Sequence, residues 1–210
     1  MIKILIADDH AIVRMGLKQI LLEEYPSARI GEVSEAESLL AEVINNEWDL
    51  VICDMNMPGR SGLDALGQIK HAAPGLPVLI MSMYPEEQYA LRVIKSGAAG
   101  YLCKDNIHED IAQAVQTVLR GRKFITPTVA EKLAEAMGTE NNGMEPHETL
   151  SDREFDVFKL LAAGKSVSEI GHQLSLSVTT VSTYRARILK KMNLDNNAGL
   201  TRYALEKGMI

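Results

Sequence analysis

The sequence predicts an α/β domain built on a doubly wound, five-stranded parallel sheet, followed by a small all-α helix-turn-helix domain. Three observations support this organisation. Over roughly the first 120 residues, short apolar runs alternate with segments of helical periodicity, which is typical of βαβ units. From Leu150 onward the pattern is helical only. Between these parts, residues 138–146 are mostly polar and contain two glycines, as expected of an interdomain linker.

Short apolar runs mark the expected strands. The run Val51-Ile52-Cys53 has no polar alternation, as expected for a central strand that is buried on both faces. The segments between the runs have apolar residues three or four positions apart, and Ile12, Met15, Ile20 and Leu21 form one such stripe. We therefore expect strands at 2–7, 29–33, 49–53, 77–82 and 100–103, and helices near 11–24, 35–46, 62–72, 86–96 and 107–120.

Capping residues mark the helices of the second half. Thr126 can cap a further helix over about 127–137. Ser151 and Glu154 have the spacing of a capping box. Further on, Ser175-Leu176-Ser177 is a tight turn between two helices, and two helices joined so closely form a helix-turn-helix. We expect the second of these helices at 178–192, one domain at 1–121, a linker at 122–147 and another domain at 148–210.

Charge is distributed unevenly along the chain, whose formal net charge is −6. Residues 151–210 hold nine lysines and arginines against six acidic residues, a net charge of +3, whereas residues 1–150 hold 13 against 22, a net charge of −9. By its net charge, only the C-terminal part is therefore suited to bind nucleic acid.

The sequence predicts a cytoplasmic protein without a membrane partner. It has no signal peptide, and no apolar run approaches the ~20 residues that cross a bilayer. Cys53 and Cys103 end two strands that should be separated by another strand, which is too far for a disulfide. We expect both thiols to be reduced, as is usual in that compartment.

Polar side chains follow the apolar runs where four strands end. Asp8 and Asp9 follow the first strand, Asp54 the third, Ser82 the fourth and Lys104 the fifth. The carboxyl ends of parallel strands meet at one edge, where open sheets bind ligands. Three carboxylates repel one another unless a cation lies among them, and such oxygens suit Mg²⁺. With a lysine and a hydroxyl to hold phosphoryl oxygens, this edge indicates a site that phosphorylates one of its own aspartates.

These strand-end residues belong to longer motifs, which are Ala7-Asp8-Asp9-His10, Asp54-Met55-Asn56-Met57-Pro58-Gly59 with Gly62-Leu63, Ser82, and Gly100-Tyr101-Leu102-Cys103-Lys104. In this order and spacing they resemble the receiver domain of two-component response regulators. The resemblance extends over about residues 1–121. It implies a flavodoxin-like fold and a cognate sensor histidine kinase that donates the phosphoryl group.

The resemblance also implies a role for each residue of the acidic site. Asp54 is the expected phosphoacceptor. Asp9, Asp54 and the backbone carbonyl of Asn56 are the expected Mg²⁺ ligands, with Asp8 binding directly or through water. Lys104 is expected to pair with a phosphoryl oxygen, or with Asp54 when no phosphate is present.

Two further positions are implied to form a switch. Ser82 is expected to bond to the phosphoryl group and move toward it, and Tyr101 to turn inward with that motion. Asp105 rather than proline follows Lys104, which leaves open whether this peptide bond is cis. His10 is expected to be a residue at the start of a helix rather than a catalytic base.

Two other functions fit the sequence less well. A Mg²⁺-dependent phosphohydrolase with an aspartyl intermediate normally carries Asp-x-Asp, whereas Asn56 stands two residues after Asp54. A DNA-binding protein with a vestigial receiver is disfavoured by the intact acidic set and Lys104. We therefore expect a phosphoacceptor and transcription factor that assists its own Mg²⁺-dependent phosphotransfer and dephosphorylation, rather than an enzyme for a foreign substrate.

The helix expected at 178–192 carries hydroxyl and basic side chains, and no acidic residue occurs from Ile170 to Leu194. Such side chains suit phosphates and the base edges of the major groove. We expect the DNA-contacting residues to be Thr179, Thr180, Ser182, Thr183, Arg185, Arg187, Lys190 and Lys191.

The motifs around this helix are Leu150-Ser151-x-Arg153-Glu154, Ala162-x-Gly164-x-Ser166, Glu169-Ile170, Leu174-x-Leu176-Ser177 and Thr180-Val181. Together they resemble the LuxR-type helix-turn-helix of NarL/FixJ-class regulators, over about residues 148–210. The resemblance implies promoter DNA as a partner and a homodimer when the protein is phosphorylated. Ser182 and Tyr184 replace the lysine and histidine that many members have, so base preferences cannot be carried over.

Overall fold

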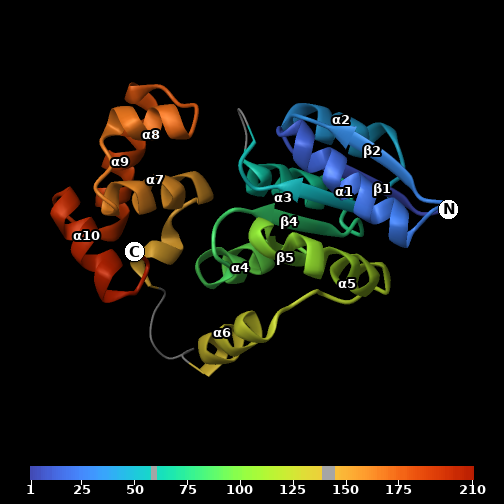
Figure 1. The fold of residues 1–210 in the computed structure, drawn as a ribbon. Coiled ribbons are helices and arrows are strands. Elements are labelled where there is room, and N and C mark those ends of the chain that lie inside the picture. The colour runs from blue at the N-terminus through green and yellow to red at the C-terminus, as the bar shows by residue number, and fades with distance from the viewer. Residues whose placement is uncertain (58–60, 139–144) are drawn as a thin grey trace. The chain divides into compact units, whose positions relative to one another are not determined.

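The structure is a computed structural model that describes residues 1–57, 61–138 and 145–210. The chain divides into two compact units, Met1–Gly138 and Thr139–Ile210 (Figure 1). Two parts of the expected features lie outside the described residues: positions 58–60 of the motif after Asp54, and positions 139–144 of the linker. No helix of the described part has both the length and the apolar character needed to cross a membrane.

The first unit is built on a five-stranded parallel sheet with the strand order β2-β1-β3-β4-β5. The predicted fold class is therefore confirmed. Because β4 lies between β3 and β5, Cys53 and Cys103 are separated by a strand, and both are free thiols. The strands span Lys3–Ala7 (β1), Arg29–Val33 (β2), Leu50–Asp54 (β3), Val78–Ser82 (β4) and Gly100–Cys103 (β5).

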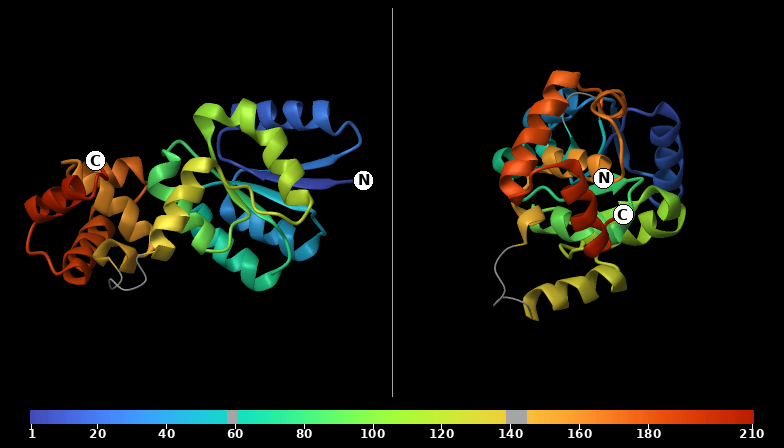
Figure 2. Two further views of the ribbon diagram at one scale, coloured as in Figure 1. Left: turned by 90° about the horizontal axis from the view of Figure 1, so that it is seen from below. Right: turned by 90° about the vertical axis from the view of Figure 1, so that its left-hand side faces the viewer.

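Helices cover both faces of this sheet (Figure 2). On one face, apolar residues of α1 and α5 form a continuous core with the strands, to which Leu17 and Val115 contribute. The helices α2, α3 and α4 lie on the other face. The helices span Ala11–Glu24 (α1), Ala36–Asn45 (α2), Gly62–Ala72 (α3), Glu86–Lys95 (α4) and Ile107–Leu119 (α5), and a short 3₁₀ helix, Lys104–Asn106 (η1), precedes α5.

The expected apolar stripe of α1 is only partly correct. Leu21 is buried and Ile20 packs against the core, but Ile12 and Met15 are 77% and 66% exposed. Leu17 and Leu21 are the buried residues of this helix. Ile12 and Met15 therefore form an exposed apolar surface in the first turns of α1.

The helix expected after Thr126 is α6, Pro127–Gly138. Thr126 caps it, because its hydroxyl accepts a hydrogen bond from the Val129 amide at 3.3 Å. This helix belongs to the first unit and packs against α4. The expected linker 122–147 thus contains a segment, 122–138, that is part of the first unit.

The second unit consists of helices whose first residues are fixed by side-chain caps. Ser151 and Ser166 both form capping boxes, with Glu154 and Glu169, and Ser177 accepts a hydrogen bond from the Thr180 amide. The helices are η2 (Pro146–Thr149, 3₁₀), α7 (Asp152–Ala162), α8 (Val167–Gln173), α9 (Val178–Met192) and α10 (Asn197–Glu206).

The predicted helix-turn-helix is formed by α8 and α9. A Cβ atom on Gly171 would lie 2.8 Å from the Leu176 carbonyl oxygen, so only glycine lets the turn approach α8 this closely. Val181, Ile188 and Met192 are buried. The opposite side of α9 is thereby left facing solvent.

Candidate functional site

The strand-end residues of the first unit come together at one edge of the sheet. Asp8 follows β1 and is fully buried, and Asp54 ends β3 with 2% of its surface exposed. Lys104 Nζ lies 2.7 Å from Asp8 Oδ2 and 3.0 Å from Asp54 Oδ2. Four side chains, those of Asp8, Asp9, His10 and Asp54, each offer a ligand atom within 4.8 Å of the others.

Burial and charge act in opposite directions on the pKa values in this cluster. Desolvation raises the pKa of Asp54 to about 6, because the charge of Lys104 only partly offsets the loss of water and Asp8 adds repulsion. Burial alone would lower the pKa of Lys104, but the Asp8 and Asp54 carboxylates outweigh it and raise that pKa. One ammonium group thus compensates two buried carboxylates incompletely.

Several oxygens at this edge have no hydrogen-bond donor among the described residues. They are Asp9 Oδ1, Asp54 Oδ2 and Asn56 Oδ1, all of them buried atoms. The contact of Asp54 Oδ2 with Lys104 is an ion pair, and His10 Nδ1 lies 2.7 Å from Asp9 Oδ1. Buried oxygens of this kind are costly unless a cation or water binds them. This donor set fits a hard divalent cation such as Mg²⁺.

A glycine lets α3 begin directly beside the phosphoacceptor candidate. A Cβ atom on Gly62 would lie 2.2 Å from the Asp54 carbonyl oxygen, which no side chain can tolerate. Gly62 N donates to the Met55 carbonyl oxygen at 2.8 Å, and Ser61 caps α3 through a capping box with Asp64. The Gly62-Leu63 part of the motif therefore allows the close approach of α3 to the end of β3.

The two expected switch residues are joined through a third residue, Tyr84. Ser82 is fully buried, and its hydroxyl accepts a hydrogen bond from the Tyr84 amide at 3.1 Å. Tyr101 is buried, and its hydroxyl donates to the Tyr84 carbonyl oxygen at 2.6 Å. The Lys104–Asp105 peptide bond, left open by the sequence, is trans.

In the second unit, α9 presents hydroxyl and basic side chains to solvent. Thr179, Ser182, Thr183, Arg187 and Lys190 are exposed. Among the described residues, neither Arg187 nor Lys190 takes part in an ion pair. This surface, which we call the α9 face, therefore has two cations available to an external partner.

Two of the expected DNA-contacting cations have partners within the second unit. Arg185 Nε donates to Asn197 Oδ1 in α10 at 2.7 Å, and Lys191 Nζ lies 2.6 Å from Glu154 Oε2 in α7. The Thr180 hydroxyl is likewise paired with the capping hydroxyl of Ser177 at 2.7 Å. These contacts attach α9 to its neighbouring helices and its own cap.

Comparison with known proteins decides the family. Residues 4–116 match the response regulator receiver domain, and residues 148–204 match the luxR family of bacterial regulatory proteins. The chain is 32% identical over 209 residues to the response regulator UvrY of Escherichia coli, covering all of this chain and 96% of UvrY. It is 34% identical over 214 residues to the oxygen regulatory protein NreC of Staphylococcus carnosus, covering 99% of each chain.

This chain is a response regulator of the NarL/FixJ class. Solved structures agree with this assignment. RcsB of Salmonella enterica serovar Typhimurium, bound to the promoter rprA in the presence of the phosphomimetic BeF₃⁻, matches the regulator with a TM-score of 0.61 and 25% identity. The match covers 97% of this chain and 98% of the RcsB chain.

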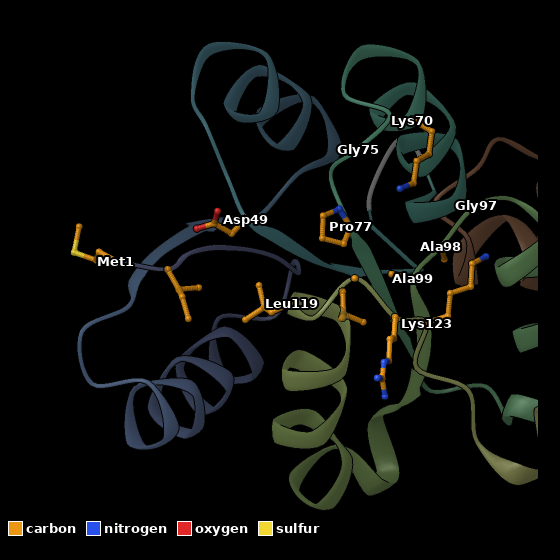
Figure 3. A pocket seen from close by; sticks show the side chains of 14 residues that line it. Met1, Asp49, Lys70, Gly75, Pro77, Gly97, Ala98, Ala99, Leu119 and Lys123 are labelled. Carbon is orange, nitrogen blue, oxygen red and sulfur yellow. The ribbon is translucent and has the colours of Figure 1, made fainter.

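A cavity in the regulator's first unit is unrelated to the acidic cluster. It has a volume of about 730 Å³ and lies at the opposite edge of the sheet, where the strands begin (Figure 3). Asp49, Pro77 and Ala99 line it at the starts of three strands, and Lys70 and Lys123 are the labelled basic side chains. None of the expected site residues contributes to it.

The sequence did not indicate two residues beside the acidic cluster, Arg14 and Tyr84. It also did not indicate that His10 contacts the aspartates. Arg14 donates to the Asp8 carbonyl oxygen at 2.6 Å, and Tyr84 connects Ser82 with Tyr101. His10 is the N-cap of α1, as expected, but its ring also contacts both aspartates. Arg14 could have been recognised from its spacing, because it lies one helical turn after His10.

Proposed function

We propose that Asp54 accepts a phosphoryl group from the phosphohistidine of a sensor kinase, and that this modification controls DNA binding by the second unit. The observation that carries the proposal is the position of Asp54, which is buried at the end of β3 and paired with Lys104 at 3.0 Å. Residues 1–121 form the receiver domain in this proposal and residues 148–210 the DNA-binding domain. The matching family models support this division.

The acidic cluster is proposed to hold one Mg²⁺ ion. Asp9 and Asp54 would be direct ligands, with Asp8 direct or through water and the Asn56 backbone carbonyl completing the protein's share. When bound, the ion neutralises charge on the phosphoryl oxygens and on the carboxylates that face them. The buried oxygens without hydrogen-bond donors support this assignment.

The transfer itself needs only groups that this edge supplies. A carboxylate oxygen of Asp54 forms a bond to phosphorus while the bond from phosphorus to the donor's imidazole nitrogen breaks, and the nitrogen keeps that electron pair. Lys104 can pair with a phosphoryl oxygen in place of its contact with Asp54. The hydroxyl of Ser82 accepts a hydrogen bond from the Tyr84 amide and also bonds to the Tyr101 side chain. It can turn its proton from Tyr101 to another phosphoryl oxygen. Water attack on the acyl phosphate at the same edge would return Asp54 to its free form.

The α9 face is proposed to enter the major groove of promoter DNA. Short hydroxyl side chains such as Ser182 and Thr183 can approach base edges, and Arg187 and Lys190 can reach phosphates. Arg185, Lys191 and Thr180 instead position α9 through their contacts within the unit. The solved RcsB structure with a promoter supports this role for a related chain. Phosphorylation is proposed to favour a homodimer on DNA.

One experiment tests both halves of the proposal. The full-length protein is incubated with Mg²⁺ and acetyl phosphate, and phosphorylation is followed by intact mass while promoter binding and molar mass are measured. We expect the parent protein to gain the mass of one acid-labile phosphoryl group. Asp54→Asn, which keeps the shape of the side chain but removes the nucleophile, should gain none. Labelling of Asp54→Asn at the parent's yield would show that another residue is the acceptor. Labelling of the parent without any change in DNA binding would refute the control of the second unit.

A further inference from the structure

The segment just before α6 is fixed to the edge of the sheet. Phe124, three residues before α6, donates its amide to the Ala99 carbonyl oxygen at 2.8 Å and forms a parallel bridge with Gly100 in β5. A Cβ atom on Gly100 would lie 3.0 Å from the Phe124 carbonyl oxygen, so the two chains are in close contact. The Phe124 ring joins the core of the sheet. The start of α6 is therefore positioned by β5.

Beyond this segment, α6 packs alongside α4 and donates hydrogen bonds to the first turn of that helix (Figure 1). The Thr126 hydroxyl donates to Glu86 Oε2 at 2.8 Å, and Lys132 Nζ donates to the Glu87 carbonyl oxygen at 2.5 Å. Val129, which lies between these two residues, is buried. We call the two polar contacts the α4–α6 clamp.

The switch residues Ser82 and Tyr101 both contact Tyr84, which lies just before the first turn of α4. Tyr84 stands two residues before Glu86, and its backbone is held by Ser82 on one side and by Tyr101 on the other. Its ring stacks on Tyr89 of α4, with the ring centroids 4.8 Å apart. Any movement of Ser82 therefore acts on Tyr84, and through Tyr84 on the start of α4.

We propose that the α4–α6 clamp transmits the phosphorylation state of Asp54 to α6, the last helix before the DNA-binding unit. The proposal rests on the function proposed for Asp54. Apolar packing tolerates small shifts of one helix along another, but hydrogen bonds weaken steeply once their geometry is lost. Because both bonds of the clamp end on Glu86 and Glu87, a displaced first turn of α4 either carries α6 with it or releases it.

The residues of the clamp allow a matched comparison. Glu86→Ala removes the acceptor for Thr126 but leaves the Thr126 cap of α6 intact, since that cap uses the hydroxyl's acceptor function toward Val129. Glu87→Ala removes the neighbouring acidic side chain from the same helical turn and keeps the backbone carbonyl that binds Lys132. Both variants lose one favourable charge at the N-terminus of α4, but only Glu86→Ala removes a bond of the clamp. The charge of Glu86 also acts on Tyr101, and Glu86→Gln, which removes that charge, controls for this effect. Glu86→Gln keeps an acceptor and should behave as the parent.

The test is hydrogen–deuterium exchange of the full-length protein, followed by mass spectrometry of peptides from α6. Samples with and without Mg²⁺ and acetyl phosphate are compared, and intact mass gives the phosphorylated fraction. In the parent and in Glu87→Ala, we expect phosphorylation to change the exchange rates of α6 amides by ~3-fold or more. In Glu86→Ala, we expect normal phosphorylation, faster exchange of α6 before phosphorylation, and a smaller response than in the parent. Combining it with Lys132→Met, which removes the second bond of the clamp, should leave less than about half of the parent's response.

Each alternative outcome contradicts a specific part of the proposal. Normal phosphorylation of the parent with unchanged exchange of α6 would overturn the clamp while leaving the role of Asp54 intact. An equal effect of Glu86→Ala and Glu87→Ala would assign the effect to helix charge rather than to the clamp. Absence of phosphorylation in every sample would overturn the role of Asp54 and the signal with it.

Discussion

Lys191 Nζ lies 2.6 Å from Glu154 Oε2, and this ion pair joins α9 to the first turn of α7. Glu154 is almost fully buried and also completes the capping box with Ser151. A buried carboxylate needs such partners, because leaving it unpaired costs far more than an exposed pair contributes. Lys191 thus holds the α9 face in position, while the exposed Lys190 beside it is available to DNA.

Replacing these adjacent lysines should therefore have different effects. Lys190→Ala should weaken binding to specific and random DNA alike and reduce the slope of log affinity against log salt by about 1. Lys191→Ala should leave that slope unchanged. It should lower the free energy of unfolding of the second unit by only about 1 kcal/mol, because the lysine is partly exposed and the Ser151 amide still donates to the Glu154 carboxylate. Binding titrations at several salt concentrations and denaturant unfolding followed by NMR measure the two effects. An equal loss of slope in both variants would place Lys191 at a phosphate.

The same ion pair predicts a pH dependence of stability. Burial raises the pKa of Glu154, but hydrogen bonds from Lys191 and Ser151 outweigh burial and hold this pKa below its ordinary value. The carboxylate therefore contributes stability that is complete above the unfolded-state pKa of about 4.3 and is lost as the pH falls through the lower, folded-state pKa. Relative to the parent, Glu154→Gln should be less stable at pH 7, and the difference should vanish in acid. A difference that grows as the pH falls would contradict this assignment.

The strand-end residues were predictable because the sheet is parallel. Once five strands are placed, their carboxyl ends must meet at one edge, and the positions of Asp8, Asp54, Ser82 and Lys104 follow without tertiary information. The exposure of Ile12 was not predictable in this way, because α1 has apolar residues on more than one side and periodicity alone did not identify the buried one.

The internal bonds of α9 and the docking of α6 were also beyond sequence reasoning. Long side chains such as Arg185 and Lys191 reach either toward solvent or back to a neighbouring helix, and only the packed structure decides between these. Phe124 lies in a short polar segment that reads as a linker, and its place in the core depends on the edge of β5. The cap at Thr126, a local feature, was predicted and is confirmed.

Asp9 should be required for Mg²⁺ binding but not for folding. It is less buried than Asp8 or Asp54, and its Oδ1 atom has no hydrogen-bond donor in the described part of the chain. Replacing a residue that only orients a metal ligand typically lowers metal affinity ~10–100-fold. Asp9 is a proposed direct ligand, so Asp9→Ala should weaken Mg²⁺ binding at least that much. Phosphorylation should slow in parallel. Asp105→Ala is the matched control, since Asp105 is exposed and outside the cluster. An unchanged Mg²⁺ titration of Asp9→Ala would remove Asp9 from the site.

The exposed start of α1 should contribute to kinase recognition. A kinase that delivers its phosphoryl group to Asp54 must cover the surface beside the acidic edge, and α1 begins two residues after Asp9. Ile12 is 77% exposed there, and a contacting anchor of this size contributes ~1.4 kcal/mol. Ile12→Ser should therefore slow transfer from the kinase ~10-fold and leave phosphorylation by acetyl phosphate unchanged. Ile44→Ser, at a residue 69% exposed on α2, controls for the loss of surface apolar area and should have no effect.

Ser82 should be needed for DNA binding to respond to phosphorylation, but not for phosphorylation itself. Its hydroxyl is the acceptor for the Tyr84 amide, so Ser82→Ala removes both that bond and the donor for a phosphoryl oxygen. Lys104 and the acidic cluster remain, and the variant should reach a phosphorylated fraction near that of the parent. DNA binding should then respond to phosphorylation much less than in the parent, whereas Ser82→Thr, which keeps the hydroxyl, should restore the response. Mass spectrometry and DNA titration on the same samples separate the two effects. A Ser82→Ala protein that is activated like the parent would show that the signal leaves the acidic edge by another route.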